Sequence, residues 1–311
     1  MVKATRQAFG EKLLDLGDKE KHLVVVSCDL SGATMTKSFG QKYPDRFFEF
    51  GIAEQNALSA SAGLAMEGFR PFIASFGAFI TGRYDQIRIS CAYNNAKVVI
   101  VGTHAGLAIG KDGATQMGLE DVNLMRGIPG MTIVQPADCI ETTQAVEYLA
   151  RSNDLTYLRL CRQPQPDIHS GDYKFQFGKG DLLQDGKDIT VFATGGVVLA
   201  ALQASRELQN EIDVRVVNIH TIKPIDTELV LKCANETKGL FTVEDHNIYG
   251  GLGTAVAEVV AAEGIPVPVF RWGIQDVFGE SGDPKDLYRK HQLDKSGLIE
   301  KIREFYKSKV I

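Results

Sequence analysis

Short apolar runs rich in β-branched residues alternate along this chain with segments that have helical spacing. Each run is short and ends in polar or turn-forming residues, which is typical of strands buried in a parallel sheet. Alternation of this kind predicts sheets covered by helices on both faces. The clearest strand-like runs in the first half are HLVVVSCDL (22–30), AKVVIVGT (96–103) and MTIVQPAD (131–138).

The alternation is interrupted over one segment, 161–180, which has two prolines, several glycines and little periodicity. It resumes at DITVFATGG (188–196). We therefore predict an α/β protein of two doubly wound domains, each a mainly parallel sheet with helices on both faces. The expected boundaries are 1–165 for the first domain, 166–185 for a linker and 186–311 for the second domain.

The composition is that of an ordinary globular chain: 311 residues, 44% hydrophobic, 23% charged and a net charge of −5. An acidic balance provides no basic surface for nucleic acid. No apolar run reaches the roughly 18 residues of a membrane span, and no signal peptide is visible, so we expect a cytoplasmic protein without a membrane partner. The five cysteines form no CxxC pair, so we expect neither a zinc site nor disulfides.

Polar residues follow several of the expected strands. In doubly wound folds, ligands bind at the carboxyl ends of the strands. We therefore expect the residues at these strand ends to face a ligand. They are Asp29, Thr103, His104, Asp138 and Arg162.

Glu54 opens a helix rich in small residues, within FFEFGIAEQNALSASAGLAMEG (47–68). A glutamate in a first helical turn has an ordinary explanation, because it interacts favourably with the helix dipole and the free backbone amides. The small residues at 57–63 favour a second explanation, since they allow another backbone to approach closely. In that case Glu54 would lie in a subunit interface, shielded from water and able to bind a protonated ring nitrogen.

Two further features accompany this helix. Phe76 and Phe79 have i, i+3 spacing and would share one face, either as core packing or as a stacking surface for a flat heteroaromatic ligand. The segment 102–121 is too glycine-rich for a helix or strand, so we expect a long loop, and loops of this length are usually functional. His104 and Asp112 lie in it.

Six stretches, in this order and spacing, resemble the transketolase family of thiamine diphosphate enzymes. The resemblance covers almost the whole chain and matches the C-terminal half of the family: a pyrimidine-binding domain followed by the C-terminal domain. The stretches are GIAEQN (51–56), SFGAF (75–79), THAGLAIGKDGATQ (103–116), LRLCRQP (158–164), TVEDHNIYGGLG (242–253) and FGESGDP (278–284).

The resemblance implies roles around the cofactor. Glu54 would hydrogen-bond the far nitrogen of the aminopyrimidine ring and favour its imino form, which makes it a catalytic as well as a cofactor-binding residue. Phe79 would stack on that ring and Phe76 would line the same pocket. Asp29 would lie near the cofactor.

The resemblance also implies a phosphosugar site. His104 and Asp112 would contact substrate hydroxyls, with His104 in a catalytic role, and Arg6 and Arg162 would bind the phosphate, for which a guanidinium is well suited. Gln116 stands where the family often has a histidine, and it is assigned to the same site. A serine of the phosphate site is replaced by Ala33, so this sequence departs from the family pattern at two positions.

The metal-binding GDG…N segment of the family's other domain is absent from this sequence, and no metal ligand is assigned to it. The resemblance therefore implies one subunit of a split transketolase. Its partner would carry the diphosphate site and Mg²⁺ or Ca²⁺, in an expected α2β2 assembly that transfers a two-carbon ketol group from a ketose phosphate to an aldose phosphate. The alternatives are the β subunit of a 2-oxoacid dehydrogenase and a related enzyme acting on another sugar phosphate. For the second domain we expect a role in dimer contact.

Overall fold

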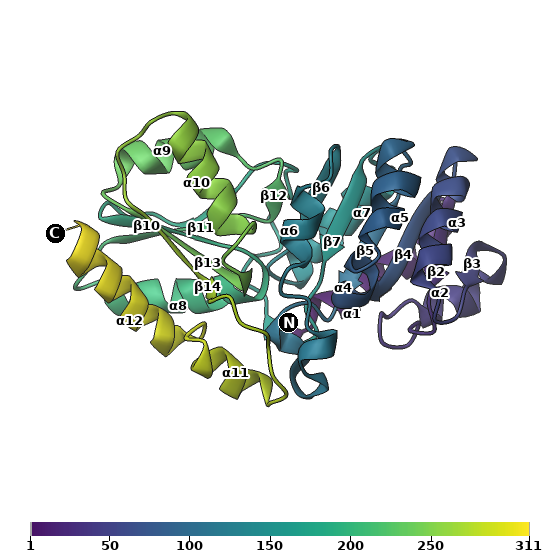
Figure 1. Ribbon diagram of the computed structural model, residues 1–311, viewed down its shortest axis with the longest axis horizontal. Coiled ribbons are helices and arrows are strands. Elements are labelled where there is room, and N and C mark those ends of the chain that lie inside the picture. The colour runs from purple at the N-terminus through teal and green to yellow at the C-terminus, as the bar shows by residue number, and fades with distance from the viewer. Residues whose placement is uncertain (1, 311) are drawn as a thin grey trace.

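The computed structural model describes residues 2–310, and its two main sheets confirm the predicted α/β architecture (Figure 1). The first sheet has the order β12-β6-β7-β5-β4-β2-β3 and is parallel except for the edge strand β12. The three strand-like runs of the first half all form strands of this sheet. The strands are β2 (Leu23–Ser27), β3 (Phe47–Glu49), β4 (Arg70–Phe76), β5 (Val99–Thr103), β6 (Met131–Val134), β7 (Leu155–Arg159) and β12 (Thr221–Lys223).

Both faces of this sheet are apolar. Successive residues of a strand point to opposite sides, and the buried strands are apolar at successive positions. Val25 of β2 packs with α1 and α7 on one face, and Val26 packs with α3 and α6 on the other. The helices are α1 (Thr5–Lys19), α2 (Lys37–Lys42), α3 (Glu54–Met66), α4 (Gly77–Thr81), α5 (Tyr84–Gln86), α6 (Asp121–Arg126) and α7 (Cys139–Arg151), with the 3-10 helices η1 (Pro44–Arg46), η3 (Leu107–Asp112) and η4 (Ala114–Gln116) and the π-helix η2 (Ile87–Tyr93).

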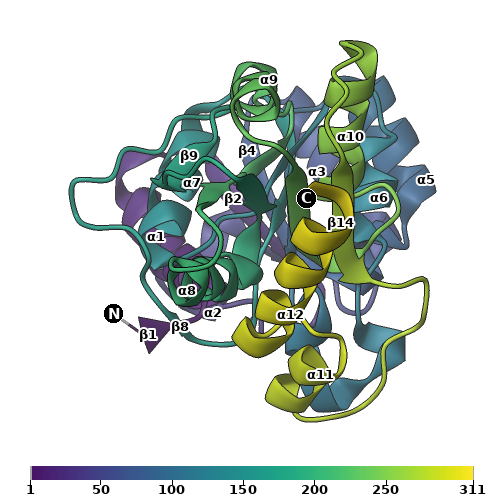
Figure 2. The same cartoon turned by 90° about the vertical axis from the view of Figure 1, so that its left-hand side faces the viewer.

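The second sheet has the order β14-β13-β10-β11-β9 and is parallel except for β9. Helices α8 and α12 pack on one face, and α9 and α10 pack on the other (Figures 1 and 2). The elements are β9 (Asp181–Gln184), β10 (Ile189–Ala193), η5 (Gly195–Val197), α8 (Val198–Leu208), β11 (Val214–Asn218), α9 (Thr227–Glu236), β13 (Leu240–Asn247), α10 (Leu252–Ala262), β14 (Val269–Ile274), α11 (Pro284–Lys290), α12 (Lys295–Phe305) and η6 (Tyr306–Val310).

Two strands near the domain junction pair outside the expected boundaries. β12 follows β11 in the chain but joins the edge of the first sheet, and β9 lies within the expected linker but pairs with β11. A small antiparallel sheet joins β1 (Val2–Lys3) to β8 (Gln165–Pro166). The boundaries at 165 and 185 stay a prediction.

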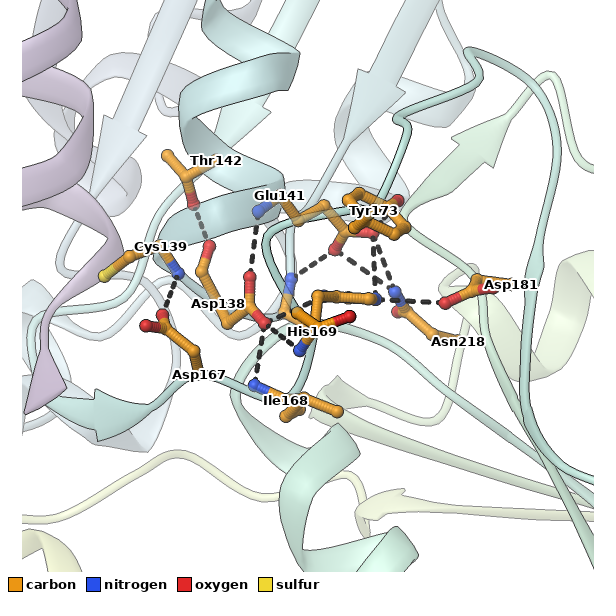
Figure 3. A network of polar contacts seen from close by, with 12 residues as sticks. Asp138, Cys139, Glu141, Thr142, Asp167, Ile168, His169, Tyr173, Asp181 and Asn218 are labelled. Carbon is orange, nitrogen blue, oxygen red and sulfur yellow. Dashed lines mark hydrogen bonds and ion pairs between the residues drawn. The ribbon is translucent and has the colours of Figure 1, made fainter. Parts of the chain in front are cut away.

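A buried polar network fixes the linker between the domains (Figure 3). Asp138 caps α7 and accepts hydrogen bonds from the backbone and from the ring of His169, with 2.8 Å between His169 Nδ1 and Asp138 Oδ2. The other ring nitrogen of His169 lies 3.0 Å from Asp181 of β9, and Asn218 of β11 donates to Glu141 at 2.9 Å. The expectation that Asp138 faces a ligand is therefore wrong, because the linker folds back over this strand end and covers it.

Candidate active site

Glu54 is the first residue of α3, and its side chain is turned into the protein. It is 4% exposed, and the Ser75 hydroxyl of β4 donates a hydrogen bond to its Oε1 at 2.9 Å. A first-turn glutamate on a solvent face would need no such partner. The burial therefore favours the second of the two explanations given by the sequence, a carboxylate shielded from bulk water.

The predicted aromatic pair is extended by a third ring. Phe76 ends β4 and stacks on Phe79 of α4, with 5.4 Å between ring centroids and 18° between planes. Phe76 also stacks on the His104 imidazole, with 4.0 Å between centroids. These contacts bring the aromatic pair and the first residue of the glycine-rich loop into one site.

His104 lies directly after β5, is 3% exposed and has a left-handed backbone (φ 57°) that few non-glycine residues adopt. Its Nδ1 lies 2.9 Å from the hydroxyl of Thr103, which itself donates to the carbonyl of Ser75 at 3.2 Å. Since that hydroxyl proton is used, Nδ1 must carry the hydrogen and Nε2 must be the acceptor. Arg6 fits this arrangement, because its Nη1, which can only donate, lies 3.3 Å from the acceptor Nε2.

The imidazole of His104 is held neutral. Burial lowers its pKa to about 3, and the charges of Arg6 and Arg162 act in the same direction. A neutral ring between two guanidinium groups can accept a hydrogen bond from a hydroxyl without adding to the local positive charge.

Two arginines approach this ring from separate elements. Arg6 of α1 donates to the carbonyl of Ala33 at 2.6 Å, and its buried Nε has no hydrogen-bond partner among the described residues. Arg162, just after β7, donates to the carbonyl of Ile109 at 2.7 Å and to the Asp112 carboxylate at 2.8 Å. Burial and then the charge of Arg162 lower the pKa of Arg6. Two neighbouring guanidinium groups, one with an unused donor, form a site suited to an anion.

The glycine-rich segment differs from the expected loop in one respect. It contains two short 3-10 turns, η3 and η4, which form because Gly106, Gly110 and Gly113 adopt left-handed conformations that reverse the chain at their ends. Asp112 is exposed at the end of η3, where it pairs with Arg162, and Gln116 is half-buried in η4.

Not every predicted site residue joins the cluster. The structure brings Arg6, Phe76, Phe79, His104, Asp112 and Arg162 together, and Ser75 links Glu54 to Thr103 beside them. The Asp29 side chain is exposed, and its backbone N–H donates to Glu49 at 2.6 Å. Within residues 2–310, no hydrogen bond joins the side chains of Asp29 or Gln116 to the cluster.

Sequence reasoning did not name Ser75 as a site residue, and it named Thr103 only as a strand-end residue beside His104. They are the polar atoms that connect Glu54 to His104, and the available signal was their position at the ends of two adjacent buried strands. Because β4 and β5 are parallel neighbours, their carboxyl ends must lie side by side.

Two family models match this chain. "Transketolase, pyrimidine binding domain" matches residues 2–166, and "Transketolase, C-terminal domain" matches residues 178–298. The chain therefore belongs to the transketolase family, whose members depend on thiamine diphosphate.

The chain matches relatives that are separate subunits along nearly their whole length, and it matches about half of the longer transketolases. It is 41% identical over 308 residues to a putative transketolase C-terminal section of Methanocaldococcus jannaschii, covering 98% of this chain and 96% of that one. It is 37% identical to one of the subunits of the apulose-4-phosphate transketolase of Phocaeicola vulgatus, covering 98% of each chain. Against the transketolase of Rattus norvegicus, 37% identical, it covers 48% of the longer chain.

Solved structures show the same difference in coverage. A split-gene transketolase, described as an inactive β4 tetramer, superposes with a TM-score of 0.90 at 38% identity, covering 99% of this chain and 100% of that one. The Campylobacter jejuni transketolase shares the fold, with a TM-score of 0.85 at 22% identity over 47% of its length.

Residues 2–310 lack two kinds of feature. They contain no helix long and apolar enough to cross a bilayer. They also contain no group of three or more His, Cys, Asp and Glu side chains that could hold a metal ion.

Proposed function

We propose that this chain is the subunit of a split transketolase that binds the aminopyrimidine of thiamine diphosphate and the sugar phosphates. The reaction is transfer of a two-carbon ketol group from a ketose phosphate to an aldose phosphate. The observation that carries the proposal is the link from Glu54 through Ser75 and Thr103 to His104, with the two arginines beside it. This link supports the proposal because an acid suited to the cofactor lies next to donors suited to a phosphosugar.

The residues present fit the cofactor. Glu54 is buried and oriented by Ser75, so its carboxyl group can hydrogen-bond a ring nitrogen, and Phe79 with Phe76 offers a flat apolar surface for the ring. When bound, thiamine diphosphate would supply the nucleophilic carbon that adds to the ketose carbonyl. Phe76 also packs on His104 and so fixes the position of the substrate-binding imidazole.

The substrate phosphate would bind Arg6 and Arg162, since their guanidinium groups are close enough for the charge of Arg162 to lower the pKa of Arg6. The Nε2 atom of His104, which lies 3.3 Å from Arg6 Nη1, would accept a hydrogen bond from a sugar hydroxyl in place of Arg6. Asp112 would bind another hydroxyl. Arg162 pairs with Asp112, so phosphate binding and hydroxyl binding involve the same ion pair.

A partner subunit would carry the diphosphate and a Mg²⁺ or Ca²⁺ ion, in an α2β2 assembly. Exposed apolar side chains near the start of α3 and in η2 support such an interface, because Ile52 and Tyr93 are each 85% exposed. The inactivity of the solved β4 relative supports the same dependence on a partner. A cytoplasmic location stays a prediction.

The test combines this chain with a separately expressed N-terminal section, thiamine diphosphate and Mg²⁺, and measures transfer from xylulose 5-phosphate to ribose 5-phosphate. We expect turnover only with both subunits. Glu54→Ala should reduce it by more than about a hundredfold, whereas Glu67→Ala, at the exposed end of the same helix, should not.

Three results would contradict the proposal. Full turnover by this chain alone would remove the need for a partner. Near-normal activity of Glu54→Ala would remove the role of Glu54. Release of carbon dioxide from pyruvate in place of ketol transfer would favour a 2-oxoacid dehydrogenase.

A further inference from the structure

The second domain contacts the loop 102–121 through one buried carboxylate. Asp245 of β13 is 4% exposed, and its Oδ1 accepts the backbone N–H of Leu107 at 2.9 Å. Its Oδ2 accepts the hydroxyl of Tyr288 in α11 at 2.6 Å. Asp245 therefore joins the loop on one side to a helix of its own domain on the other.

The loop backbone lies directly against this carboxylate. Gly106 has a left-handed backbone (φ 76°), and a Cβ atom there would be 2.1 Å from Asp245 Oδ2. The site accepts only glycine for two reasons, the conformation and the closeness of the acid. Such an approach allows the Leu107 amide to reach Asp245.

Further contacts between the second domain and the same loop surround this one. Two are hydrogen bonds and one is a packing contact; two reach η3 and one lies after η4. The N–H of Asn247 donates to the carbonyl of Leu119 at 2.8 Å, the hydroxyl of Ser281 donates to the carbonyl of Lys111 at 2.5 Å, and Pro284 lies against Gly110.

We propose that Asp245, fixed by Tyr288, is a positioning residue that holds the loop 102–121 in the arrangement that binds substrate. The proposal rests on the proposed function of that loop, whose His104 and Asp112 would bind the sugar. It gives the second domain a part in substrate binding beyond the dimer contact that the sequence suggested.

The physical reason is the entropy of the loop. Its glycines allow many backbone conformations, and fixing each residue costs about 1–2 kcal/mol. A charged acceptor that is shielded from water binds a backbone amide more strongly than a neutral one. Asp245 thus offsets part of the ordering cost at Leu107. It adds to the contacts that Arg162 and Gln163 of the first domain make with residues 108–112.

The chain offers a matched control in the neighbouring residue. Glu244 is equally buried, at 2% exposed, and it lies on the same strand. It faces the other side and accepts the N–H groups of Leu252 and Gly253 at the start of α10. Glu244→Gln therefore replaces a buried acid next to Asp245 without removing a hydrogen bond to the loop. Burial raises the pKa of this glutamate to about 7.

The first experiment measures amide hydrogen exchange by mass spectrometry in the full chain. Asp245→Asn should raise exchange over residues 105–113 by about tenfold or more, and Tyr288→Phe should raise it less. Glu244→Gln should leave these amides unchanged. Unaltered exchange at 105–113 in folded Asp245→Asn, or an equal increase in Glu244→Gln, would overturn the proposal.

The second experiment uses the assembled enzyme. Tyr288→Phe, which keeps the ring and removes one hydrogen bond, should raise the KM for the ketose phosphate several-fold with kcat nearly unchanged. A fall in kcat at constant KM would overturn the positioning role. If the assembled enzyme shows no ketol transfer, the proposed function fails, whereas the exchange experiment still decides whether Asp245 holds the loop.

Discussion

Two buried histidines of this chain are held in opposite charge states. The side chains of His104 and His169 are each 3% exposed. The neighbours of His104 are Arg6 and Arg162, and burial together with their charges lowers its pKa to about 3. For His169, burial alone would lower the pKa, but hydrogen bonds to Asp138 and Asp181 and the charge of Glu141 raise it to about 10 (Figure 3).

The difference shows how one residue type serves two purposes. The neutral ring of His104 presents an acceptor nitrogen, Nε2, at a site rich in positive charge. The charged ring of His169 is committed to carboxylates from both domains and so fixes their junction. The sign of the neighbouring charges, more than the extent of burial, decides which role a buried imidazole can take.

The largest expected effect is the loss of catalytic efficiency on removing the neutral imidazole of His104. In the assembled enzyme, His104→Ala should lower kcat/KM for ketol transfer by about a hundredfold to a thousandfold, because the hydroxyl acceptor beside the arginines is lost. Steady-state kinetics measure this effect. Thermal unfolding of the same variant should change little, and a large loss of stability with intact kcat/KM would reverse the assignment of the two histidines.

Replacing the charged His169 should lower stability strongly and activity only weakly, the reverse of the result expected for His104→Ala. His169→Gln leaves three carboxylates, Asp138, Glu141 and Asp181, without their cation, and should lower the free energy of unfolding by about 3 kcal/mol. Chemical denaturation measures it, with His22→Gln, an exposed substitution in the first domain, as the control. Ketol transfer by the folded variant should stay within about threefold of the parent. An unchanged denaturation midpoint would show that the network contributes nothing to domain docking.

The two rings should also affect stability in opposite pH ranges. The folded-state pKa of His169 is raised from 6.5 to about 10, so its contribution is complete below about pH 6.5 and is lost as pH rises through 10. The pKa of His104 is lowered to about 3, so its contribution is present above about pH 6.5 and is lost as pH falls through 3. Unfolding measured from pH 7 to pH 10 should show a decline of at most about 1.4 kcal/mol per pH unit that His169→Gln reduces. A decline of the same slope in the variant would contradict this origin.

The sequence predicted the two sheets well because their strands are continuous β-branched runs, whose burial follows from composition. It did not predict that β12 joins the first sheet, since an edge pairing between segments distant in sequence leaves no local pattern. The position of His104 after a strand was visible, but its charge depends on Arg6, which lies 98 residues away in sequence. His169 gave no signal because it lies in an aperiodic linker, and its carboxylate partners come from two other segments, the start of α7 and β9.

The smallest expected effect concerns the exposed ion pair of Arg162 and Asp112, near the neutral His104. The Arg162 side chain is 37% exposed and Asp112 is 38% exposed, so solvent weakens their ion pair. Arg162→Lys keeps the charge but loses the planar pair of donors, and it should raise the KM for the ketose phosphate by about tenfold with little change in kcat.

Asp112→Asn serves as the comparison for this variant, because it removes the charge of the partner while leaving both guanidinium groups in place. It should raise KM less than Arg162→Lys if the arginine binds the phosphate directly. If Asp112→Asn were the more harmful of the two, the arginine would serve mainly to orient Asp112. The phosphate would then depend on Arg6, whose buried Nε has no other hydrogen-bond partner among the described residues.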